Sequence, residues 1–149
     1  MSKRALPVAA VAAVILFALA GCQATPGAFL RASAQADVVA WTKTAESAAG
    51  SPTATIRFDG YEKCRTDNGF FTMTFQWRTI TDLAVDSSEQ SSVTADISRE
   101  FSADGWAVKA AQGLVTITGP TSDSHRGLVQ IQTAGDSQLA VSVTSPCYS

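Results

Sequence analysis

One stretch of this chain constrains the fold more than any other, because apolar and polar residues alternate in it without interruption. Its apolar members all share one parity and are Phe71, Met73, Phe75 and Trp77. A period of two is typical of a β-strand with one side against a core and the other toward solvent. The earlier segment 56–59 alternates in the same way. We therefore expect a sheet with one apolar face.

A tight turn is predicted between these two strands. The dipeptide Asn68-Gly69 is a strong signal for a β-hairpin. If these two residues form the loop, Cys64 lies on the aromatic side of the hairpin, where a buried disulfide would fit. The same register places Glu62 opposite Phe75, which sets a carboxylate against an aromatic ring. A bulge near Gly60 or a looser turn would relieve this conflict, so we predict the hairpin and leave its register open.

Two amphipathic helices are predicted on either side of this hairpin. The first begins at Thr25-Pro26, with threonine as the N-cap and proline in the first turn, and ends at Gly50-Ser51-Pro52. Its apolar residues recur at spacings of three and four and are Leu30, Ala34, Val38, Trp41, Ala45 and Ala48. The second helix is predicted from about Ser87 to Ala103, with Gly105 after its C-terminal end.

Short candidate strands fill the rest of the chain. They are Trp106–Ala110, Leu114–Thr118, Leu128–Thr133 and Leu139–Thr144. Strands joined by tight turns pair antiparallel, and helices then cover one face of such a sheet. We therefore predict an α+β fold, an antiparallel sheet of about five strands with two helices packed on one face and one disulfide.

The N-terminus differs in composition from the rest of the chain. Lys3 and Arg4 precede an apolar run from Ala5 to Ala20, which stops at Gly21. A basic start, a short apolar segment and small residues at a cleavage site are typical of an export signal. The run is short for a transmembrane helix, which needs about 20 apolar residues. We expect the remainder of the chain to be exported.

The end of this segment also carries a more specific motif. Leu19-Ala20-Gly21-Cys22 resembles the lipobox of bacterial lipoproteins. In that family a diacylglyceryl group is attached to the cysteine thiol, and the signal is cut just before it. The resemblance implies a signal peptide at 1–21, a lipidated tether at 22–28 and a single domain at 29–149, anchored through Cys22 on the extracytoplasmic face of the cell membrane. The alternative is an ordinary secretory signal with a chance cysteine.

Removal of residues 1–21 changes the charge balance. Lys3 and Arg4 are lost, so eleven basic residues become nine against thirteen acidic ones, and the net charge becomes −4. A nucleic-acid partner would favour a basic patch. The composition therefore argues against nucleic-acid binding.

Two cysteines remain besides Cys22. An oxidising environment favours a disulfide between Cys64 and Cys147. The other interpretation is a reactive or metal-binding thiol pair, but two cysteines 83 positions apart with a single histidine in the chain make a poor metal site. Cys147 shares the parity of the apolar residues in the last strand and would point into the core, unless Pro146 ends that strand first.

The exported part also resembles, loosely, small lipoproteins of actinobacteria, many of unknown function. The shared features are a lipobox, an N-terminal helix, a mid-chain cysteine, the pair Gly105-Trp106 and the terminal Ser145-Pro146-Cys147. These motifs are structural. The resemblance therefore implies the fold and the disulfide and no activity.

Catalytic candidates are few. A polar loop around the only histidine holds Ser122, Asp123, Ser124 and His125. A hydrolase would use them as nucleophile, orienter and base, but a catalytic triad gathers residues from separate elements. The carboxylates that could form a glycosidase-like pair are Asp59, Glu62, Asp82, Asp86 and Glu89. We expect no metal site and no cofactor.

The aromatic residues Phe71, Phe75 and Trp77 either pack in the core or line a ligand groove. The leading hypothesis is a non-enzymatic envelope lipoprotein that binds a protein, a cell-wall component or a small apolar ligand at the membrane surface. One alternative is an envelope hydrolase that uses His125 or a carboxylate pair. The other is a structural or regulatory accessory of a membrane complex.

Overall fold

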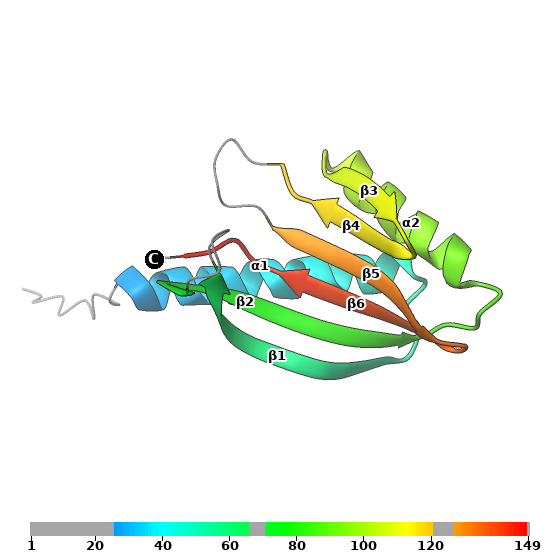
Figure 1. The fold of residues 1–149 in the computed structure, drawn as a ribbon, viewed down its shortest axis with the longest axis horizontal. Coiled ribbons are helices and arrows are strands. Elements are labelled where there is room, and N and C mark those ends of the chain that lie inside the picture. The colour runs from blue at the N-terminus through cyan, green and yellow to red at the C-terminus, as the bar shows by residue number, and fades with distance from the viewer. Residues whose placement is uncertain (1–25, 66–70, 121–126, 149) are drawn as a thin grey trace, which may run out of the picture.

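A computed structural model describes residues 26–65, 71–120 and 127–148 of the chain (Figure 1). Its elements in chain order are α1 (Pro26–Ala48), β1 (Ala54–Arg65), β2 (Phe71–Ala84), α2 (Gln90–Ala103), β3 (Ala107–Ala111), β4 (Leu114–Thr118), β5 (Leu128–Gly135) and β6 (Gln138–Thr144).

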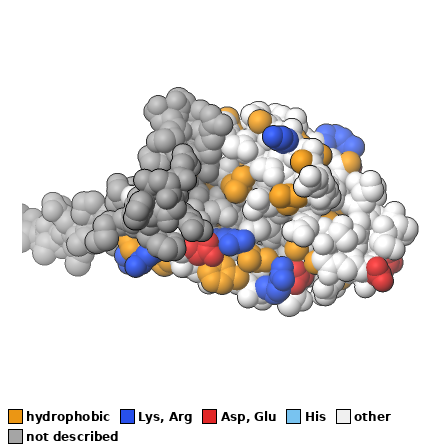
Figure 2. All heavy atoms as spheres, in the orientation of Figure 1, with side chains coloured by type: hydrophobic (Ala, Val, Ile, Leu, Met, Phe, Trp, Pro, Cys, Tyr) orange, Lys and Arg blue, Asp and Glu red, His pale blue; other side chains and the backbone are white. Residues whose placement is uncertain are grey.

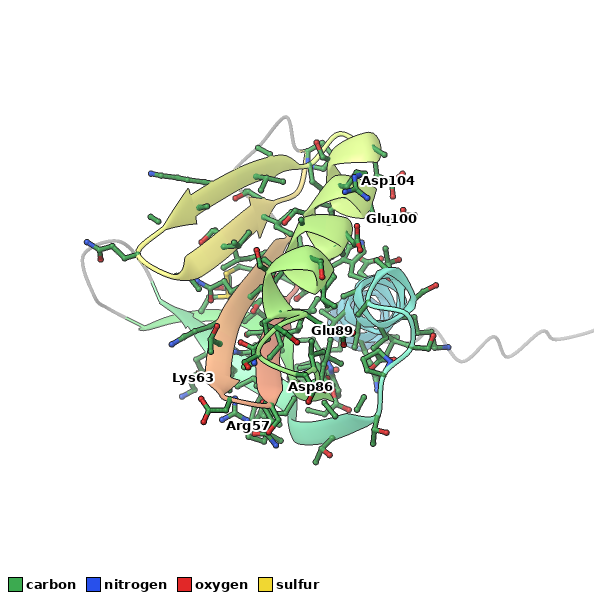
Figure 3. All side chains as sticks on the ribbon, turned by 90° about the vertical axis from the view of Figure 1, so that its right-hand side faces the viewer. Arg57, Lys63, Asp86, Glu89, Glu100 and Asp104 are labelled. Carbon is green, nitrogen blue, oxygen red and sulfur yellow. A yellow bond between two sulfur atoms is a disulfide. The ribbon has the colours of Figure 1, made fainter. Side chains whose placement is uncertain are left out.

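The strands form one antiparallel sheet in the order β1-β2-β6-β5-β4-β3. Both helices pack on the same face, so the molecule has two layers (Figure 3). The predicted α+β architecture is confirmed, with six strands instead of about five. The strand β6 comes last in the chain and lies between β2 and β5. It therefore joins the pair β1–β2 to the group β3–β4–β5, whose strands all precede it in the sequence.

The core lies between the sheet and the two helices. The strand residues that face the helices alternate along each strand, and the buried ones are Thr79, Thr81, Leu83, Ile117, Val129, Ile131, Leu139, Val141 and Val143. Helix α1 contributes Val38 and Ala45, and α2 contributes Ile97 and Phe101. The apolar stripe predicted for the first helix therefore faces the core over its described side chains.

An aromatic group closes one end of this core. The ring of Trp106 lies edge-on to those of Trp41 and Phe101, with both centroid separations at 5.0 Å. Gly119 and Gly127 pass directly beneath these rings, and a Cβ atom added at Gly127 would lie 2.6 Å from the ring of Trp41. Trp41 is therefore partly buried and packs against the core, and the glycines make room for its ring.

The ends of the two helices follow local backbone chemistry. Helix α1 begins at Pro26, and Gly50 after its last turn has φ +79°, a left-handed conformation that glycine adopts without strain. The predicted start of the second helix at Ser87 is three residues too early. The carbonyl of Asp86 first accepts hydrogen bonds from the N–H groups of Glu89 and Gln90, which forms a turn before α2 begins.

The hairpin of β1 and β2 is confirmed, but the register considered from the sequence is wrong. Glu62 lies opposite Gln76, and Lys63 lies opposite Phe75. The register shifts twice: Arg57 is an extra residue on β1 between Ile56 and Phe58, and three residues of β2 lie opposite Cys64 alone between Lys63 and Arg65. In the register between these two shifts, Glu62 lies opposite a polar residue and not an aromatic ring. The predicted turn Asn68-Gly69 lies outside the described residues.

No helix within the described residues is long and apolar enough to cross a membrane. The segment predicted to be a signal peptide and Cys22 lie outside the described part of the chain.

Candidate functional site

The face of the sheet that is not covered by helices has a trough along its central strand. On this face β6 carries the short side chains Ala140, Ser142 and Thr144. The neighbouring strands carry longer ones that stand on either side, namely Arg78 and Ile80 on β2 and Leu128, Gln130 and Gln132 on β5. We call these eight residues the β6 trough. Short side chains on the central strand between longer ones on its neighbours produce the depression.

Two adjoining hollows of about 260 and 170 Å³ lie along the β6 trough. Arg78 and Gln130 line both hollows from opposite sides. The larger hollow reaches Ser145 and Cys147, and the smaller one extends past Ala140. Together they follow the last five residues of β6, which span about 13 Å at the rise of a β-strand. The trough therefore suits an elongated ligand more than a compact one.

Arg78 is held in place on the wall of the trough. Its Nε donates a hydrogen bond to Ser142 Oγ at 3.0 Å, and its Nη1 donates to Glu62 Oε1 at 3.2 Å. The Arg78 and Glu62 side chains are each about one-third exposed, at 32% and 33%. The Nη2 group of Arg78 makes no hydrogen bond within the described residues. It can donate to a ligand without breaking the existing contacts.

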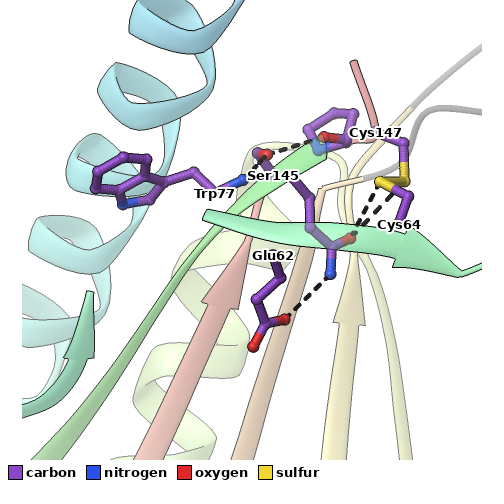
Figure 4. The surroundings of a disulfide bond; sticks show 7 residues. Glu62, Cys64, Trp77, Ser145 and Cys147 are labelled. Carbon is purple, nitrogen blue, oxygen red and sulfur yellow. Dashed lines mark hydrogen bonds between the residues drawn. A yellow bond between two sulfur atoms is a disulfide. The ribbon is translucent and has the colours of Figure 1, made fainter. Parts of the chain in front are cut away.

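The disulfide forms one end of the trough (Figure 4). Cys64 and Cys147 are bonded, with their Cα atoms 6.0 Å apart, so the predicted pairing is confirmed. Gln76 lies between the disulfide and the arginine. Its Oε1 lies 3.9 and 3.8 Å from the two sulfur atoms, and its Nε2 donates to Glu62 Oε2 at 3.4 Å. Since a disulfide has no S–H proton, the sulfur contacts are packing contacts.

The disulfide lies on the side of the sheet away from the helices, which corrects the placement of Cys64 on the aromatic side. Cys64 continues the alternation of Glu62 along β1, so its side chain lies on the open face beside Gln76. Strand β6 ends at Thr144, and Cys147 follows on a segment that runs beyond it. Ser145 fixes the start of that segment, because its Oγ accepts a hydrogen bond from Trp77 N and its own N–H donates to Trp77 O, both at 2.8 Å.

The charged side chains that line the trough are paired within the protein. Besides Arg78 and Glu62, Arg57 Nε lies 3.0 Å from Asp82 Oδ2. Figure 2 shows this face, where basic and acidic side chains lie beside one another instead of forming patches of one sign. The trough therefore offers amide, hydroxyl and guanidinium groups in a nearly neutral setting. Such a lining favours an uncharged ligand that both donates and accepts hydrogen bonds.

Two residues of the predicted aromatic groove, Phe75 and Trp77, lie on the opposite face, toward the helices. Trp77 Nε1 donates to Asp59 Oδ1 at 2.7 Å, and its ring lies edge-on to that of Tyr61. The guanidinium of Arg31 lies 5.3 Å from the ring centre of Phe75. The two rings are thus engaged in contacts within the domain and lie away from the β6 trough. The side chain of Phe71 lies outside the described residues.

The structure does not bring the first candidate carboxylate pair together. Asp59 lies opposite Thr79 on the helix-facing side, whereas Glu62 lies opposite Gln76 on the open face. Asp82 is paired with Arg57, and Asp86 and Glu89 lie exposed before α2 (Figure 3). Ser122, Asp123, Ser124 and His125 lie outside the described residues. Within the described ranges, no group of three or more His, Cys, Asp or Glu side chains is arranged to hold a metal ion.

A larger hollow of about 530 Å³ lies between α2 and the β3–β4 hairpin. Its lining is mostly alanine, glycine, serine and threonine, with no charged side chain. Of its two long polar side chains, Gln90 and Gln112, the amide of Gln90 already donates toward the carbonyls of Val85, Gly135 and Gln138. Few side chains there can reach a ligand, so we consider the β6 trough the better candidate.

Comparison of the chain with protein-family models, with curated proteins and with solved structures gave no match. The candidate site therefore depends on geometry alone. The sequence did hold a signal for it, because Gln76, Arg78, Gln130 and Ser142 are the polar members of the alternating strands. The sequence pattern did not show the strand order, which places β2, β6 and β5 side by side and so brings these residues together.

Proposed function

We propose that this protein is a lipid-anchored extracytoplasmic lipoprotein whose α+β domain is a non-enzymatic binding module of the cell envelope. The β6 trough is its binding surface, and its ligand is a chain-like cell-wall component that carries amide and hydroxyl groups. The observation on which this proposal depends is the trough itself, with its row of hydrogen-bonding side chains between paired charges.

The sequence supports the anchored location. Leu19-Ala20-Gly21-Cys22 follows a basic and then an apolar segment, which is the arrangement of a lipoprotein signal. A diacyl modification binds a membrane strongly, because each buried methylene contributes about 0.8 kcal/mol. A disulfide in the domain is consistent with an oxidising compartment outside the cytoplasm.

The geometry supports a polymer over a small apolar ligand. Gln130 and Gln132 project from β5, and each side-chain amide can donate and accept hydrogen bonds at once. Arg78 faces them from β2 with donors to spare. A glycan strand with N-acetyl and hydroxyl groups, or its attached peptide, presents the complementary groups along an extended chain. An apolar ligand would leave these amides unsatisfied, which costs about 1–3 kcal/mol for each buried group.

Binding is tested with insoluble cell-wall material that is sedimented with the purified full chain. The variant Ala140→Leu raises the floor of the trough and should increase the apparent dissociation constant at least about tenfold, because it keeps the ligand out of hydrogen-bond range. Ala107→Leu is the matched control, since it makes the same change on the same face but on the edge strand β3. The proposal fails if the wild-type chain does not sediment or if both variants lose binding equally.

The anchor is tested separately. Mass spectrometry of the protein extracted from membranes should show a chain that begins at Cys22 and carries a diacylglyceryl group. The variant Cys22→Ala should leave the membrane fraction. An uncut, unmodified chain recovered from the cytosol would exclude the proposed location.

A further inference from the structure

The outer edge of β1 is an unoccupied pairing surface. Strand β1 lies at the end of the sheet, and its outer side faces no strand within the described residues (Figure 1). The segment from Phe58 to Lys63 lies between two register shifts and pairs regularly with β2. Tyr61 on this segment is 41% exposed although it is aromatic. Open edges of this kind pair readily with another strand.

A second copy of the same strand can pair with this edge only in certain registers. In an antiparallel pair, the backbone groups that point to one edge belong to alternate residues. Two copies related by a twofold axis must therefore match residues whose numbers differ by an even amount. Within the regular segment, the axis can pass only through Asp59, Gly60, Tyr61 or Glu62.

Charge decides between these four registers. An axis through Asp59 or Glu62 sets that carboxylate directly against the same carboxylate of the other copy. An axis through Gly60 sets Lys63 of each copy against Arg57 of the other. An axis through Tyr61 instead sets Asp59 of each copy against Lys63 of the other. Opposite charges across a strand pair stabilise it, and like charges destabilise it. The register centred on Tyr61 is therefore the favoured one.

Asp59 and Lys63 are both positioned for this contact in the single copy. Asp59 Oδ1 accepts hydrogen bonds from Trp77 Nε1 at 2.7 Å and Thr79 Oγ1 at 2.8 Å, which fixes the carboxylate on the helix-facing side. Its other oxygen makes no hydrogen bond within the described residues. Lys63 lies exposed on the same side of β1 and forms no ion pair with a described residue.

We propose that two copies of this chain associate through antiparallel pairing of β1 edges, with the twofold axis at Tyr61 and two Asp59–Lys63 ion pairs flanking it. The sheet then continues from one copy into the other. Pairing over five residues of each copy buries less surface than the interface of an obligate dimer, so the dimer is expected at high local concentration. This inference does not depend on what the β6 trough binds.

The position of the axis is tested by crosslinking of the full chain with a single added cysteine. In the proposed register the two Tyr61→Cys residues are directly opposite, with Cα atoms about 4.5–5.5 Å apart, within the range of a disulfide. Val108→Cys is the matched control, because Val108 lies on the other edge strand and is 42% exposed. We expect a dimer linked through position 61, identified by peptide mapping, at several times the yield of the control. Equal yields, or no 61–61 linkage, would overturn the proposal.

The charge pairs are tested with the native Tyr61 in place. Lys63→Glu turns both opposite-charge pairs into like-charge pairs, so the dimer dissociation constant measured by analytical ultracentrifugation should rise at least about tenfold. Lys109→Glu makes the same change in net charge on the exposed edge strand β3 and should leave the constant unchanged. Equal effects of the two variants would overturn the register, as would no effect of Lys63→Glu.

Discussion

Removal of the Cys64–Cys147 disulfide should destabilise the domain mainly through the unfolded state. The bond closes a loop over a sequence separation of 83 residues. The chain-entropy relation gives about 15 cal/mol/K for such a loop, or about 4.5 kcal/mol at 25 °C. With an unfolding entropy of about 2.1 cal/mol/K per residue, a domain of this size should lose on the order of 15–20 °C in Tm. The loss of about 4.5 kcal/mol is a large fraction of the free energy of unfolding of a typical domain.

The assay is urea unfolding of the double variant Cys64→Ala/Cys147→Ala beside the wild type with and without reductant. Either single variant removes the same crosslink and should lose a similar amount. Amide exchange at Tyr148 and Phe75, whose backbones exchange two hydrogen bonds of 2.8 Å, reports whether the C-terminal segment also detaches locally. A loss of less than about 2 kcal/mol would refute the loop-entropy reasoning.

Two further predictions concern the core and the C-terminal segment. Gly127→Ala should lower the free energy of unfolding by about 1–3 kcal/mol, because its Cβ would overlap the ring of Trp41; Gly60→Ala meets only ordinary contacts and should change little in the same denaturation assay. Burial raises the pKa of the Tyr148 hydroxyl above its usual 10.0, and the nearby charge of Asp37 and the hydrogen bond to it act in the same direction. A raised folded-state pKa means that this stabilisation is complete below pH 10 and is lost as the pH rises through the folded value. Tm should therefore fall in that alkaline range more steeply for the wild type than for Tyr148→Phe, and parallel curves would contradict this.

Much of the fold could be predicted because local patterns determine it. The alternation from Phe71 to Trp77 required a strand, and the three- and four-residue spacing around Val38 required a helix. The disulfide followed from counting cysteines. For the strand and the helix, a single segment of the chain carries the whole signal.

The rest depends on features that no single segment contains. The extra residue at Arg57 reverses the alternation of β1 after Ile56, so the sequence pattern alone could not show that Cys64 lies on the open face. Helix α2 starts at Gln90 because a turn precedes it. Several polar residues in this region could have served as the N-cap, so the sequence did not determine the first residue of the helix. The β6 trough requires Ser142 to lie between Arg78 and Gln130, and this follows only from a strand order that departs from sequence order.

That strand order also has a consequence for how the protein is made. The strand that joins the two halves of the sheet is the last of the six to leave the ribosome. Before β6 is in place, the other strands can form only a hairpin of β1 and β2 and a separate meander of β3, β4 and β5, each with an open edge where β6 belongs. Closure of the hydrophobic layer must therefore wait until synthesis of this region is complete, and a chain truncated before Gln138 lacks the strand that unites its halves.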